Sequence, residues 1–334
     1  MRRFAFIILF STTLFSICGE EGVWPFDSSY WETVTIEELV MISETEIEID
    51  AEDQGGYTAL LYGAGLSNDP EVITFLLEKE AEIDKRAGSQ WTPLMFAVSS
   101  NNNPEISRRL IEGGADVNAV DSRGYTVLMT AASWCGNPEI IKILLDAGAD
   151  VQTRNPYSHN TALMYAAAWN QSPEITGLLL EYGSNRETRD NEGRTALMLS
   201  AEMNQNPAVF FRLMANKADI SKRDIAGRTL LMLASAGYNP EIVESLYNKG
   251  VELEAYDAEG RSVWDYISQN ENMKGSDIYW VMNDLYYDGK WQLAPPIENE
   301  PENDAESVPE LNELPELPST GILTTDSLLK ILTD

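Results

Sequence analysis

Apolar and polar positions between Tyr125 and Asp150 alternate at helical spacing in two blocks. In the first block, Ala131 and Ala132 follow Leu128 at three and four residues, and Ala132 follows Met129 at three, whereas the two-residue alternation of a strand is missing. This block predicts a short helix with one apolar face.

The second block opens with the start signals of another helix. Asn137 can cap it, Pro138 suits the first helical position, and Glu139 favours the positive end of the helix dipole. Gly148 stands where a left-handed residue ends a helix. The apolar face between these signals consists of Ile140, Ile141, Leu144 and Leu145. Together the two blocks predict a helical hairpin.

The hairpin pattern recurs along most of the chain. First helices begin at a threonine or serine followed by apolar residues: Thr58, Thr92, Thr126, Thr161, Thr195, Thr229 and Ser262. The proline of the second helix recurs in phase: Pro70, Pro104, Pro138, Pro173, Pro207 and Pro240. A lone pair of short helices cannot bury its apolar face, so successive pairs are expected to stack into a solenoid.

These motifs resemble those of ankyrin-repeat proteins. The residues that carry the resemblance are Gly-x-Thr-x-Leu followed by Ala-Ala, a Leu-Leu pair in the second helix, and the exits Gly114-Ala115-Asp116-Val117-Asn118 and Gly148-Ala149-Asp150-Val151. The resemblance covers roughly residues 34 to 293. It implies an all-α solenoid of stacked helix-turn-helix units with β-hairpin-like finger loops.

The chain departs from the family pattern at one column of positions. The family usually has a histidine after Thr-Pro-Leu, whereas this chain has Leu61, Met95, Met129, Met164, Met198 and Met232. The hydrogen bonds between repeats that such histidines make are therefore expected to be absent, with thioethers filling the space by packing. The turn between the two helices also looks one residue longer than usual.

The flanks of the repeats predict caps and tails. An acidic irregular lead (20–33) precedes a half-repeat cap (34–56), and full repeats follow from residue 57. Residues 261–293 are expected to form the C-terminal cap, and 294–334 an acidic, proline-rich, disordered tail. Three aromatic residues are expected to cover the open end of the solenoid: Trp264, Trp280 and Tyr286.

The first 19 residues have the pattern of a secretory signal peptide. Arg2 and Arg3 precede an apolar run that is short for a membrane span. We therefore expect an exported protein of bacterial type, in the periplasm or cell envelope. The sequence ending at Cys18 is similar to a lipobox, although Ile17 is bulky there. Acylation of Cys18 and ordinary cleavage after Cys18 or Gly19 are both open.

The net charge is −31 and both flanks are acidic. Twelve acids and no base lie from Glu20 to Asp53, and ten acids and one base lie in 294–334. Such a chain disfavours nucleic acid and anionic membranes as partners. The charge either keeps the solenoid soluble or complements a partner with a basic surface.

Motifs for catalysis are missing from the sequence. It has no glycine-rich phosphate loop, Cys-x-x-Cys pair or nucleophile elbow, and His159 is its single histidine. Cys135 is expected to be a packing residue rather than a reactive thiol. No enzyme activity, cofactor or metal is expected.

The resemblance also implies where a partner binds. In the family, the fingers and the exposed face of the first helices line a concave groove, and the two residues after Ala-Ala are frequent contacts. On the helices this implies Ser133, Trp134, Ala168, Trp169, Glu202, Met203, Ala236 and Gly237, and on the fingers Arg123, Tyr125, Tyr157, Asn160, Glu192, Arg194 and Arg228. The alternative is that the two indoles pack over neighbouring helices.

The sequence therefore predicts a non-catalytic, monomeric protein-binding module of the cell envelope. The expected anchors are Trp134, Trp169, Tyr125 and Tyr157, because aromatic residues contribute much of the energy at interfaces. One alternative is a scaffold or tether that acts through a lipidated Cys18 or the acidic tail. An alternative of another class is a secreted enzyme or enzyme modulator.

Overall fold

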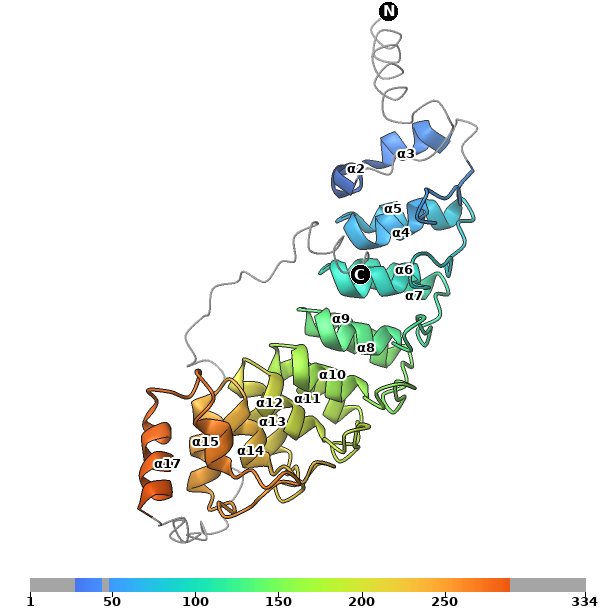
Figure 1. Ribbon diagram of the computed structural model, residues 1–334. Helices are drawn as coiled ribbons and strands as arrows, with labels where there is room; N and C mark the ends of the chain where they lie inside the picture. The colour runs from blue at the N-terminus through green and yellow to red at the C-terminus, as the bar shows by residue number, and fades with distance from the viewer. Residues whose placement is uncertain (1–27, 44–47, 289–334) are drawn as a thin grey trace, which may run out of the picture.

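The structure is a computed structural model that describes residues 28–43 and 48–288 (Figure 1). The predicted leader with Cys18, the lead up to residue 27 and the tail 294–334 lie outside the described residues. The first helices of the repeats are α4 (Ala59–Leu66), α6 (Pro93–Ser100), α8 (Val127–Trp134), α10 (Ala162–Trp169), α12 (Ala196–Met203), α14 (Leu230–Ala236) and α16 (Val263–Ile267). The second helices are α5 (Pro70–Glu78), α7 (Pro104–Glu112), α9 (Pro138–Asp146), α11 (Pro173–Glu181), α13 (Pro207–Ala215), α15 (Pro240–Asn248) and α17 (Asp277–Tyr287).

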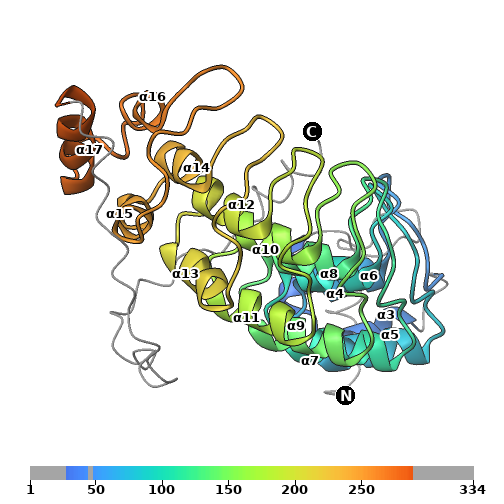
Figure 2. The ribbon, with the colours of Figure 1, turned by 90° about the horizontal axis from the view of Figure 1, so that it is seen from below.

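The helix pairs stack in two layers. Each first helix packs on the first helix of the next repeat, and the second helices pack on one another in the same way. Figure 2 shows the two rows of helices, with the finger loops extending from the row of first helices. The described residues contain no sheet; the fingers hold isolated bridges only, such as Val120 to Thr126. The predicted all-α solenoid is confirmed.

The predicted start and stop signals act as expected. The side chains of Asn103, Asn137 and Asn206 each accept a hydrogen bond from the backbone N–H two residues later, and a proline follows each of them. Gly148 ends α9 with a φ of 90°. His159 and Gln90, which stand where the other five fingers have glycine, adopt φ values of 61° and 68°.

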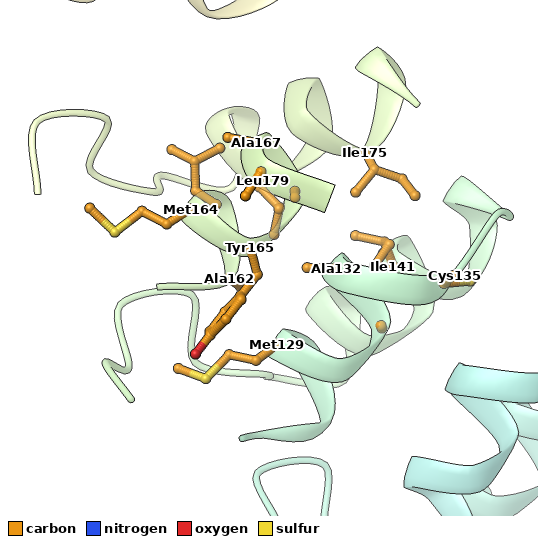
Figure 3. Close-up of a cluster of buried hydrophobic side chains, with 14 of the residues drawn as sticks. Met129, Ala132, Cys135, Ile141, Ala162, Met164, Tyr165, Ala167, Ile175 and Leu179 are labelled. Atoms are coloured by element: carbon orange, nitrogen blue, oxygen red, sulfur yellow. The ribbon is translucent and has the colours of Figure 1, made fainter. Parts of the chain in front are cut away.

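The core runs as a continuous band between the layers. All six side chains of the column that replaces the family histidine are buried. Figure 3 shows Met129 and Met164 from neighbouring repeats within one apolar cluster, together with Ala132, Ala167 and Ile175. The prediction that thioethers fill this column is confirmed, and packing at native density favours a flexible side chain there.

Asparagines that are buried or partly buried supply hydrogen bonds between repeats that could not be predicted from the sequence. The Asn170 amide donates to the carbonyl oxygens of Ala132 (3.0 Å) and Cys135 (2.9 Å) in the preceding repeat. Its Oδ1 accepts from the Ser172 N–H at 2.9 Å. Asn101, Asn204 and Asn270 make equivalent bonds, and we call these four residues the asparagine ladder.

The capping asparagines form a second set of links at the same turns. The Asn137 amide donates to the Asn102 carbonyl at 3.0 Å, and the Asn206 amide to the Gln171 carbonyl at 2.6 Å. Each turn is therefore hydrogen-bonded to the turn of the preceding repeat.

The N-terminal cap differs from the predicted half repeat. Residues of the predicted irregular lead form a helix, α2 (Ser28–Thr33), which packs on α4, while α3 (Ile36–Ser43) packs on α5. Trp31 of α2 is fully buried. The cap is thus a pair of helices that begins at residue 28 rather than 34, because the burial of one indole stabilises a helix with weak local signals.

Two of the three aromatic residues that were predicted to cover the C-terminal end of the solenoid do so. Trp264 is buried, and its ring stacks on Tyr286 with 5.3 Å between ring centroids. Trp280 does not cover the end of the solenoid: 56% of this residue is exposed on α17.

We expect Asn170→Ala to lower the free energy of unfolding by about 3 kcal/mol, because it leaves two buried carbonyls and one N–H without partners. Urea denaturation followed by circular dichroism measures this change. Gln171→Ala, at the exposed neighbouring position, is the control and should change stability by less than about 0.5 kcal/mol. Equal stability of the two variants would contradict a structural role for the ladder.

Candidate protein-binding face

Two tryptophans project from the same position of adjacent repeats. Trp134 and Trp169 are the last residues of α8 and α10, which pack on each other, and each is 50% exposed. The residues before them, Ser133 and Ala168, are small and buried. The residues next to each indole are therefore too small to cover it, and half of each tryptophan is accessible to a partner.

The row continues into the following repeats. Met203 is partly buried and packs against the core at the equivalent position of α12. Tyr238, which sequence reasoning missed, is 46% exposed in the turn after α14. Repeat six is one residue shorter before its proline: Gly237 stands at the position of Trp169 counted from the threonine, and Tyr238 stands at the position of Gln171 counted back from the proline. We call Trp134, Trp169, Met203 and Tyr238 the turn-edge row.

The finger residues form a separate group. Arg123 and Tyr157 are exposed, whereas Tyr125 is partly buried with its ring 4.8 Å from that of Tyr165. The Arg123 guanidinium lies over the Tyr125 ring at 5.6 Å. Asn160 is partly buried as well. Fingers precede the first helices and the turn-edge row ends them, so the predicted contacts fall at opposite ends of eight-residue helices, about 12 Å apart.

Arg194 holds the fingers together rather than facing outward. Only 16% of its side chain is exposed, and its guanidinium contacts Asp190 (2.9 Å), Glu192 (3.3 Å) and Glu202 (3.3 Å). Burial opposes the charged form, but these carboxylates raise the pKa of Arg194. Arg228 of the next repeat shares Glu202 at 3.0 Å. The network links repeats and leaves Arg194 little capacity for a partner.

Cys135 occupies the asparagine-ladder position of its repeat. Its thiol is buried and its Sγ accepts a hydrogen bond from the Asn137 N–H at 3.4 Å. Burial is the main cause that raises the pKa of Cys135 to about 11. The thiol is therefore protonated at neutral pH, as expected for a packing residue.

Other candidate sites lie away from the predicted residues. A shallow pocket of about 410 Å³ lies on the second helices and includes Arg108, Glu139, Lys142 and Asp146 in its lining. Across residues 28–43 and 48–288, no group of three or more histidine, cysteine or acidic side chains is placed to hold a metal. No helix in the same ranges is long and apolar enough to cross a bilayer.

Comparisons with known proteins agree with this architecture. The family model described as ankyrin repeats (3 copies) matches residues 61–155 and 153–224. Among solved structures, the chain is similar to the human ASB11 ankyrin repeat domain with 20% identity and a TM-score of 0.58, over 65% of this chain and 96% of that chain. No curated protein matches the chain in sequence. At this identity the likeness concerns the fold alone.

We expect the Cys135 thiol to stay unreactive toward a disulfide reagent at pH 7 until the solenoid unfolds, because it is buried and protonated. A Cys18→Ser variant isolates its signal, and release of the thiolate chromophore measures it. The same variant in denaturant is the control and should react fully. Rapid labelling of the folded protein would contradict the structural role of this thiol.

Proposed function

The chain carries ankyrin repeats, and we propose that it is a non-catalytic module that binds another protein through the turn-edge row. The observation that carries this proposal is the exposure of Trp134 and Trp169 side by side on packed helices. Ankyrin-repeat folds typically bind other proteins rather than catalyse reactions, and the binding proposed here needs no catalytic group.

The exposed indoles offer apolar surface that a bound partner can bury. A half-exposed tryptophan leaves apolar area in water that a partner can bury, at about 25 cal/mol per Å². Large aromatic residues in the centre of a contact are the usual hot spots. The asparagine ladder and the capping asparagines hold the turns that carry this row, so little conformational entropy is lost on binding.

We further propose that the protein is exported, of bacterial type and monomeric. Export is supported by the sequence of residues 1–19, with its basic start and short apolar run. Cys18 is either the acylated first residue of the mature protein or removed with the leader. An anchored solenoid would act as a tether near the membrane, which is the second candidate function, and the lipobox-like residues favour it.

We expect Trp134→Ala/Trp169→Ala to lower the affinity for a partner captured from envelope extracts by roughly 30-fold or more, as for hot-spot residues. The full chain serves as bait, and the readout is quantitative mass spectrometry of captured proteins. Trp280→Ala is the matched control, because Trp280 is as exposed but lies on α17, away from the row.

Loss of one partner from the double variant, with capture by Trp280→Ala unchanged, supports the row. Equal capture by all three proteins would refute it and direct attention to the tail or the cap. Turnover of a substrate by the purified chain would overturn the non-catalytic assignment.

We expect the mature protein from a secretion-competent bacterium to lack its leader, because the basic start and apolar run are the signals that export machinery cleaves. Intact-mass and N-terminal peptide mass spectrometry measure this directly. Acyl mass on Cys18 identifies a lipoprotein, and an unmodified terminus at Gly19 or Glu20 identifies ordinary cleavage. An intact terminus at Met1 would contradict export.

A further inference from the structure

We infer that the turn-edge row takes an extended protein segment that carries lysine or arginine, with one apolar residue for each repeat. The inference rests on the proposed binding function and specifies the partner's chemistry. It follows from three features: the spacing of the side chains of the row, the amide groups in the turns after it, and the carboxylates in the first turns of the helices that begin there.

The spacing of the repeats matches an extended chain. Packed helices lie 8–10 Å apart, so the anchors on α8, α10 and α12 recur at about 10 Å. An extended segment rises about 3.3 Å per residue, and every third residue therefore meets the next repeat. A helical ligand rises about 1.5 Å per residue and would need about seven residues for the same step.

The side chains next to the row also favour an extended ligand. Gln171 and Gln205 are exposed in the turns that follow Trp169 and Met203. Their amides can donate to and accept from a peptide backbone. An extended segment has free backbone N–H and C=O groups, whereas those of a helix are paired within the helix. The turns thus offer the hydrogen bonds that an extended chain requires.

Glutamates recur in the first turns of the second helices that begin after the turns of the row, except in α13, which has Ala208 there. Glu71 and Glu105 are paired with Arg109, and Glu139 contacts Arg108 at 3.5 Å. Glu174 and Glu241 are exposed, and neither has an ion pair within the described part of the chain, although Glu174 accepts a hydrogen bond from the Ser172 hydroxyl at 2.6 Å. The glutamates without a cation are those that follow Trp169 and Tyr238.

A basic ligand satisfies both kinds of group at once. A lysine or arginine beside Trp169 can contact the face of the indole and the Glu174 carboxylate together. Glu174 and Glu241 lie two repeats apart, which corresponds to about six residues of an extended chain. The net charge of −31 also attracts a basic segment at long range, an effect that salt screens.

The test uses synthetic peptides of about ten residues labelled with fluorescein, titrated with the purified full chain and followed by anisotropy. The probe has leucine at every third position and two lysines about six positions apart, in a serine background. One comparison peptide has glutamate for lysine, and another has the same composition with leucine at every second position. Each titration is repeated at high salt.

We expect the lysine probe to bind at least tenfold more tightly than either comparison peptide, and more weakly at high salt. Glu174→Gln/Glu241→Gln should weaken it roughly fivefold, as for exposed ion pairs. Glu112→Gln/Glu244→Gln is the matched control, since both glutamates are exposed on second helices and lie outside the row. The control should bind as the wild type does.

The outcomes separate this inference from the proposed function. Equal binding of the glutamate or respaced peptide, or no binding of the lysine probe at about 1 mM, overturns the inference. The proposed function still stands in that case if partner capture depends on Trp134 and Trp169. Peptide binding that Trp134→Ala/Trp169→Ala leaves unchanged would also overturn the inference, because the peptide would then bind away from the row, while the proposed function would still be decided by partner capture.

Discussion

The burial of apolar helix faces between successive repeats is the interaction on which the whole structure depends. The first and second helices of the repeats are mostly seven to nine residues long, too short to be stable alone in water. Each becomes stable because neighbouring helices cover its apolar face, so the outermost helices at the two ends of the solenoid need other residues to cover them. Trp31 of α2 covers one end and Trp264, stacked on Tyr286, covers the other.

Stacking of the helices alone leaves backbone groups in the turns without hydrogen-bond partners. Asparagine side chains supply these partners. Backbone carbonyls such as those of Ala132 and Cys135 end a helix and are buried, so they need donors. A histidine column usually ties ankyrin repeats together; here methionines fill that column, and the asparagine ladder makes links between repeats from a different place. The methionine column thus provides apolar packing between repeats, and the asparagine ladder provides hydrogen bonds between them.

The fold could be predicted from the sequence because its signals are local. A cap such as Asn137, the proline after it and the stop at Gly148 each act within one helix, and their period shows that the units stack. The ladder could not be predicted, since each amide bonds to carbonyls more than 30 residues away. Helix α2 was missed for a related reason: it is stabilised by contacts distant in sequence, such as the burial of Trp31 and the stacking of its ring on Tyr62.

The positions of the residues on the candidate face could be predicted from the sequence, but the side chains that surround them could not. An alignment places Trp134 and Trp169 on equivalent helix ends, yet it cannot show that carboxylates already occupy Arg194 or that Tyr238 is exposed in the next turns. Exposure at these turns is compatible with stability because the ladder, not the row, holds the backbone. Side chains in the row are therefore free to match a partner, since the repeats remain joined whatever residues stand there.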